Sequence, residues 1–61
     1  MPYEIRLSHV PDGARTEDYL GHDRNCATRR EAEAVVREFR AAKKARPADF
    51  EPEMAAEIVR L

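Results

Sequence analysis

The segment from Gly21 to Cys26, GHDRNC, holds most of the side chains in this chain that could do chemistry. It places a histidine, an aspartate, an arginine, an asparagine and the single cysteine of the chain within six residues. Imidazole, thiolate and carboxylate groups bind zinc, and a cysteine near a histidine is also the arrangement of a thiol nucleophile. The segment is therefore a metal site, a thiol active site or a polar turn.

A zinc site here would take its ligands from His22, Asp23 and Cys26, with His9 arriving from a neighbouring strand. Structural zinc sites usually have four ligands in cysteine-rich sets with paired spacing. This chain has one cysteine, and its two histidines are not three to five residues apart. We therefore expect no metal and no other cofactor, and we interpret GHDRNC as a polar turn in which Cys26 packs inward as a small hydrophobic residue.

A thiol active site would pair Cys26 with His22 or His9. Cys26 lies two residues before Thr28, the expected cap of a helix, and a helix N-terminus lowers the pKa of a thiol. Catalysis also requires a base within hydrogen-bond reach and a pocket for the substrate. A chain of 61 residues has little volume for a pocket of the usual ~300 Å³ or more, so we expect no enzymatic activity and no catalytic residue.

The length and composition indicate one small domain that spans residues 1–61. A core of this size is marginal without a disulfide, a metal or a partner, and one cysteine forms no internal disulfide. The lone thiol and the lack of a secretory segment predict a protein of the reducing cytoplasm. No apolar run approaches the ~20 residues that cross a bilayer. Eleven basic and twelve acidic residues nearly cancel, which argues against bulk capture of nucleic acid.

Hydropathy patterns predict a hairpin before GHDRNC. Residues Tyr3 to Val10 alternate between apolar and polar types, which is typical of a half-buried antiparallel strand. Pro11 to Gly13, PDG, supply turn chemistry. A second strand is expected at Tyr19 to His22, which gives a hairpin with a longer loop.

A helix is predicted over residues 29–45. Thr28 and Glu31 form a capping box, in which each side chain accepts a hydrogen bond from the backbone of the other residue. Pro47 ends the helix. Its apolar residues fall on one stripe, and they are Ala32, Val35, Val36, Phe39 and Ala42.

The last ten residues have two interpretations. A second helix would begin at Pro52, whereas a third strand over Ala56 to Leu61 would pair beside the first strand. We favour the strand, because two strands alone would cover the helix poorly. The predicted fold class is α+β, a ββαβ domain with a three-stranded antiparallel sheet and one helix packed across it. The alternative is a β-hairpin plus two helices.

Charge is distributed unevenly along the chain. Residues 28–46 carry seven basic and three acidic residues, a net charge of +4. Residues 47–61 carry one basic and four acidic residues, a net charge of −3. The ordinary interpretation of the helix is a solvated face with ion pairs from Glu33 to Arg37 and Arg30. The functional one is that a partner protein contacts its basic flank (Arg30, Arg37, Arg40 and Lys44) and the acidic tail (Asp49, Glu51 and Glu53).

The order of strand, PDG turn, strand and a helix that opens with ATRREAEAVV resembles small ββα DNA-binding modules. AP2-type domains and the arm-binding domains of tyrosine integrases are built in this way, often with a T-x-x-E-A run. The matching residues here are Thr28, Glu31 and Ala32, and the resemblance covers residues 3–45. It implies DNA contacts from the exposed face of the sheet, and the candidate contacts are Arg6, Arg15 and Arg24.

The small size and the polarised surface are also similar in style to very small proteins of phages and other mobile elements. Those proteins commonly dock on a host protein and block it, anti-CRISPR proteins among them. We therefore expect a non-enzymatic module that binds another macromolecule, in the first place a protein, as an adaptor or inhibitor. DNA binding through the sheet or the basic helix is the alternative, a homodimer is a third interpretation, and no membrane is involved.

Overall fold

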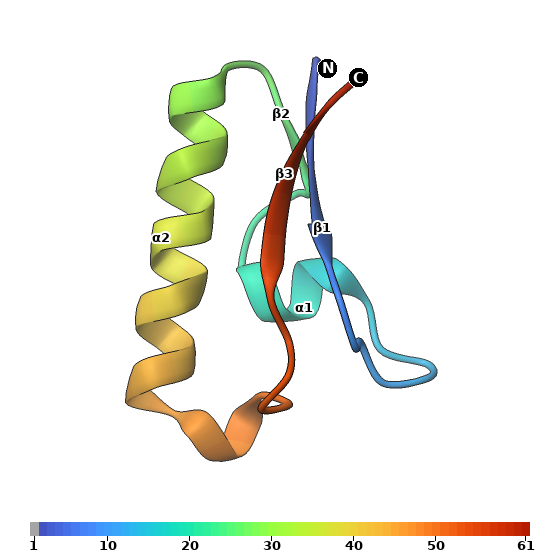
Figure 1. Cartoon of the computed structure of the whole chain (residues 1–61), viewed down its shortest axis with the longest axis vertical. Helices are drawn as coiled ribbons and strands as arrows, with labels where there is room; N and C mark the ends of the chain where they lie inside the picture. Colours follow the sequence, from blue (N-terminus) through green and yellow to red (C-terminus); the bar gives the residue numbers. More distant parts are fainter. Residues whose placement is uncertain (1) are drawn as a thin grey trace.

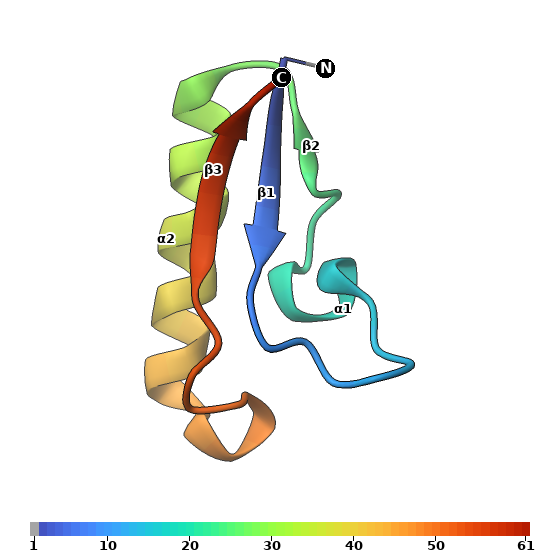
Figure 2. The same ribbon diagram turned by 45° about the vertical axis from the view of Figure 1, so that its right-hand side comes forward.

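The computed structural model describes residues 2–61, in which three strands and two α-helices form an α+β domain (Figure 1). The elements are β1 (Tyr3–Leu7), α1 (Thr16–Leu20), β2 (Asn25–Cys26), α2 (Arg29–Ala45), the 3-10 turn η1 (Pro47–Asp49) and β3 (Ala56–Arg60). The sheet is antiparallel with the order β2-β1-β3, so that the first strand is central. The long helix α2 runs along one face of this open sheet (Figure 2).

The predicted fold class is confirmed, and so are the bounds of the long helix. The tail forms a strand rather than a second helix. β3 pairs with all five residues of β1, from Tyr3 opposite Arg60 to Leu7 opposite Ala56. Because β2 pairs with only two residues of β1, β3 supplies most of the hydrogen bonds of the central strand. No helix within residues 2–61 is long and apolar enough to cross a membrane.

The predicted position of the second strand is wrong. Tyr19 and Leu20 end the short helix α1, and Gly21 follows it in the left-handed conformation (φ 65°) that stops a helix. At the other end of α1, the carboxylate of Asp18 accepts a hydrogen bond from the Arg15 N–H at 3.3 Å. These local bonds favour one helical turn. The second strand is instead β2, whose two residues form a strand only because β1 lies beside them.

Two further boundaries differ from the prediction. β1 ends at Leu7 rather than at Val10, and His9 bends the chain with a positive φ of 59°. The interpretation of GHDRNC as a turn holds for its first four residues, which are irregular. Its last two residues, Asn25 and Cys26, pair with Glu4 and Tyr3.

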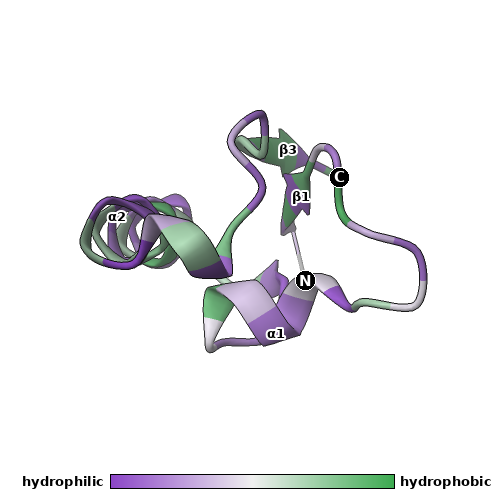
Figure 3. Ribbon diagram, turned by 90° about the horizontal axis from the view of Figure 1, so that it is seen from below, coloured by the Kyte–Doolittle hydropathy of each residue, from purple (hydrophilic) through white to green (hydrophobic). Residues whose placement is uncertain are grey.

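The core lies where α2, α1 and the β1–β3 pair enclose it from different sides (Figure 3). Phe39 of α2 lies at its centre, 2% exposed, with its ring centroid 5.6 Å from that of Phe50 in an edge-on arrangement. The ring centroid of Phe50 also lies 5.7 Å from that of Tyr19. This contact joins α1 to the tail of the chain. The buried hydrophobic residues are Ile5, Leu20, Cys26, Ala32, Val35, Val36, Phe39 and Met54.

Candidate functional site

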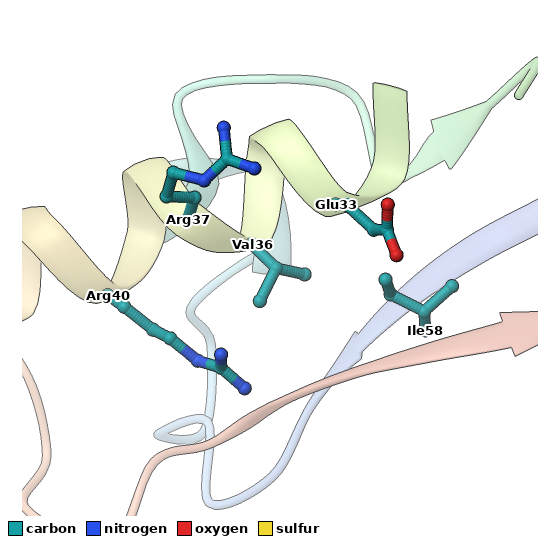
Figure 4. A pocket seen from close by; sticks show the side chains of 5 residues that line it. All are labelled: Glu33, Val36, Arg37, Arg40 and Ile58. Atoms are coloured by element: carbon teal, nitrogen blue, oxygen red, sulfur yellow. The ribbon is translucent and has the colours of Figure 1, made fainter. Parts of the chain in front are cut away.

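A groove lies between α2 and β3, and two of the predicted partner-contact residues line it (Figure 4). Its volume is about 390 Å³. Val36 and Glu33 point towards Ile58 of β3 in this view, and Arg40 extends towards β3 beside them, whereas Arg37 points away from the floor. The aliphatic side chains of Val36, which is buried, and Ile58, which is half-buried, make the floor of the groove apolar. Both arginines at its rim are exposed.

The hydrogen bonds between β1 and β3 determine which backbone groups of β3 point to its outer edge. The Ser8 N–H donates to the Ala55 carbonyl at 3.0 Å, and the Leu61 N–H donates to the Pro2 carbonyl at 2.8 Å. Antiparallel strands alternate between residues that bond to one neighbour and residues that face the other side. The peptide groups of Ala56, Ile58 and Arg60 therefore point to the outer edge of β3, on which no strand pairs within residues 2–61.

The predicted ion pairs of the basic flank do not form. Glu33 contacts Arg29, with Oε2 3.4 Å from Nε, rather than Arg30 or Arg37. Long side chains on a helix lean towards its N-terminus, which directs Glu33 to the preceding turn. In the part of the chain that is described, Arg30, Arg37, Arg40 and Lys44 have no carboxylate oxygen within 4.0 Å. Their charge is available to a partner.

The acidic residues predicted to contact a partner lie outside this groove. Asp49 of η1 is paired with Arg46, with Oδ2 3.8 Å from Nε. Glu51 and Glu53 are exposed in the loop that leads from η1 to β3. These three acidic residues do not line the groove, and neither do Arg30 and Lys44 of the basic flank.

Of the three arginines expected to contact DNA, Arg6 and Arg24 both lie close enough to Glu4 to act on its charge. Arg6 is bound to Glu4 on the open face of the sheet, with Nε 2.7 Å from Oε1. This hydrogen bond lowers the pKa of the Glu4 carboxyl, and the positive charges of Arg6 and Arg24 act in the same direction. Arg15 precedes α1, in a different part of the fold. Glu4 therefore offsets one of the two positive charges that Arg6 and Arg24 bring to its surroundings.

A second candidate site lies where GHDRNC meets the start of α2. His22, Cys26 and Glu31 each offer one ligand atom, and these atoms all lie within 4.8 Å of one another. The sequence pattern pointed to the first two residues as possible ligands, but to Glu31 only as part of a helix cap. His9 and Asp23 do not belong to the cluster. The signal for Glu31 was the capping box itself, because it turns the carboxylate back towards the residues before the helix.

The surroundings of Cys26 differ from those of a reactive thiol. The residue is 0% exposed, as its prediction as a small hydrophobic core residue requires. Burial raises the pKa of the Cys26 thiol, and the negative charges of Glu31 and Asp23 raise it further. The start of α2 therefore does not yield a thiolate of lowered pKa, and the free thiol stays protonated at neutral pH.

Comparisons of the chain with models of protein families, with curated proteins and with solved structures found no significant match.

Proposed function

We propose that the protein is a non-enzymatic binding module, and that it docks on an acidic, extended segment of another protein through the groove between α2 and β3. One observation carries this proposal. The unpaired edge of β3 lies beside an apolar floor at whose rim lie Arg37 and Arg40, neither of which has an ion-pair partner within residues 2–61.

Each part of the groove matches one part of such a segment. The outward peptide groups of Ala56, Ile58 and Arg60 would pair with its backbone, as in β-strand addition, where main-chain hydrogen bonds supply affinity. An apolar side chain would contact Val36 and Ile58. Flanking carboxylates would form charge-assisted hydrogen bonds with the guanidinium groups at the rim, which is why the partner is expected to be acidic.

This mode of binding fits an adaptor or an inhibitor. A module that adds a strand to its partner covers the surface that it occupies, and charge on the groove steers association and specificity. The manner of action is that of small phage or mobile-element proteins that block a host protein. We place it in the reducing cytoplasm, which suits a free cysteine with no disulfide.

A displayed library of random heptapeptides tests the proposal without a known partner. The selected peptides should alternate acidic and β-branched residues, and the double variant R37E/R40E should weaken their binding at least tenfold. The double variant R15E/R24E is the matched control, because it reverses the same number of charges outside the groove. Selection of peptides without acidic residues, or equal binding to both variants, would contradict the proposal.

DNA binding is the alternative function, and the four cations of the basic flank, which have no ion-pair partner among the described residues, favour it. Fluorescence anisotropy with duplex and single-stranded DNA measures it directly. If the protein contacts phosphates, the logarithm of its binding constant should fall linearly with the logarithm of the salt concentration. Loss of binding in R37E/R40E would assign the contact to α2, and loss in R15E/R24E would assign it to the candidate contacts outside α2. No binding at low salt would remove this alternative.

A second copy of the chain would compete for the same edge of β3, because an unpaired strand edge is also a template for self-association. Native mass spectrometry at micromolar concentration separates the two occupants. A monomer that binds acidic peptides supports the docking proposal. A stable dimer that excludes them would replace the acidic segment by a second copy.

A further inference from the structure

A contact with the backbone holds the ring of His22 in one orientation. Its Nδ1 contacts the backbone carbonyl of Asp23, and a carbonyl oxygen accepts but does not donate a hydrogen bond. Nδ1 therefore carries a proton, which leaves Nε2 as the ring atom that can bind a metal. Histidine ligands of metals almost always donate their second ring N–H in this way, because the bond fixes both tautomer and orientation.

The two oxygen atoms of the Glu31 carboxylate likewise have different partners. Oε2 accepts a hydrogen bond from the Ala27 N–H at 3.2 Å, which anchors the group. Oε1 lies 3.4 Å from Nε2 of His22 and is free to face it. Each of the two side chains thus uses one atom for a bond to the backbone and directs the other to the same point.

The thiol of Cys26 completes the set from the side of the core. The residue is 0% exposed and free, and its sulfur lies within 4.8 Å of the two other ligand atoms. Three ligands thus arrive from three elements: the loop after α1, β2 and the first turn of α2.

The separations approach those of a tetrahedral zinc site. Bonds of about 2.1 Å from zinc to nitrogen and oxygen place those two ligands about 3.4 Å apart. That is the observed separation of His22 Nε2 and Glu31 Oε1. A zinc–sulfur bond of about 2.3 Å requires the sulfur to lie about 3.6 Å from the other ligands, so that the Cys26 sulfur would have to move by about 1.3 Å at most.

We propose that His22, Cys26 and Glu31 bind one divalent ion of the zinc type. Sulfur and imidazole nitrogen select such an ion over magnesium and calcium, which prefer all-oxygen ligand sets. Three protein ligands leave a fourth position open, as in zinc sites that bind water or another molecule. His22 and Glu31 also line a surface hollow with Leu20 and Val35.

The test is a titration of the reduced, metal-free full chain with Co²⁺, which replaces zinc and has a thiolate charge-transfer band in the near ultraviolet. We expect this band to saturate at one ion per chain and to disappear when Zn²⁺ is added. The variant Cys26→Ala should lose the band. The variants His22→Asn and Glu31→Gln should bind Co²⁺ at least tenfold more weakly, because even loss of an outer hydrogen-bond partner of a metal ligand costs 10–100-fold in affinity.

Two matched variants serve as controls. His9→Asn replaces the other histidine, and asparagine accepts the left-handed backbone at that position. Glu38→Gln replaces a carboxylate that lines the same hollow. Both should leave the affinity unchanged within twofold. Absence of the band in the wild type, or equal weakening by His9→Asn and His22→Asn, would overturn the proposal. The exposed position of His22 keeps the test valid even if Cys26→Ala does not fold.

The metal site uses none of the residues that line the docking groove. Peptide binding that survives in His22→Asn, together with cobalt binding that survives in R37E/R40E, would show that the two proposals stand separately. Loss of cobalt binding in R37E/R40E would instead count against His22, Cys26 and Glu31 as the ligands.

Discussion

Nε2 of His22 and Oε1 of Glu31 lie 3.4 Å apart, although nine positions separate the two residues in the chain. This contact fastens the loop after α1 to the first turn of α2. Both side chains are about 40% exposed, 38% for the histidine and 40% for the glutamate. A polar contact this open to water contributes only ~0–1 kcal/mol to stability by itself.

The contribution of His22 to the free energy of unfolding should therefore depend on whether a metal ion is bound. In the presence of excess EDTA, His22→Asn should change the free energy of unfolding by less than about 1 kcal/mol. With Zn²⁺ at 100 times its Kd, the wild type should gain about 2.7 kcal/mol and the variant much less, because a ligand that binds only the folded state stabilises it. Urea denaturation with and without Zn²⁺ measures both values. Equal stabilisation of the two proteins would place the metal elsewhere.

Lys43 is expected to stabilise the tail of the domain. Its Nζ donates to the carbonyl oxygens of Pro52 and Met54, at 2.9 and 2.8 Å, and so ties the segment before β3 to α2. Lys43→Met keeps the aliphatic stem and removes both bonds, which should cost about 1–2 kcal/mol in urea denaturation. Lys44→Met, one residue further on, should stay within about 0.5 kcal/mol of the wild type. A similar cost for both variants would assign the effect to charge rather than to these bonds.

The Thr28 hydroxyl should account for much of the stability of the start of α2. It accepts a hydrogen bond from the Glu31 N–H at 3.1 Å. The return bond differs from a standard capping box, since Glu31 Oε2 accepts from Ala27 rather than from Thr28. Thr28→Ala should cost about 0.5–2 kcal/mol, measured by thermal or urea denaturation, and Thr28→Ser should restore most of it. A serine variant as unstable as the alanine variant would refute the cap.

Glu4 should make the stability of the folded protein depend on pH in the acidic range. Its pKa is lowered in the folded state, first by the hydrogen bond from Arg6. A carboxyl with a lowered folded pKa stabilises the protein above its unfolded pKa of about 4.3, and this stabilisation is lost as the pH falls through the folded pKa. Between about pH 5 and about pH 2, the wild type should thus lose more stability than Glu4→Gln. Parallel stability curves for the two proteins would contradict this assignment.

The sequence by itself determined the elements whose signals are local. The stripe and the cap of α2 lie within the helix, so its bounds at residues 29 and 45 follow from the pattern alone. The alternation from Tyr3 to Val10 likewise predicted a half-buried strand, and Ile5 of β1 is 0% exposed. β3 was favoured over a helix because one hairpin would leave the helix uncovered.

Only the tertiary structure decided the short elements. Tyr19 to His22 is too short for its pattern to separate a strand from a helical turn, and the bond from Arg15 to Asp18 favoured the turn. β2 has two residues, so it is a strand only by virtue of β1 beside it. The cluster of His22, Cys26 and Glu31 likewise depends on how separate elements pack together. Cys26 and Glu31 meet His22 because β2 reverses directly into α2, and a search of the sequence for paired ligand spacing does not detect such a meeting.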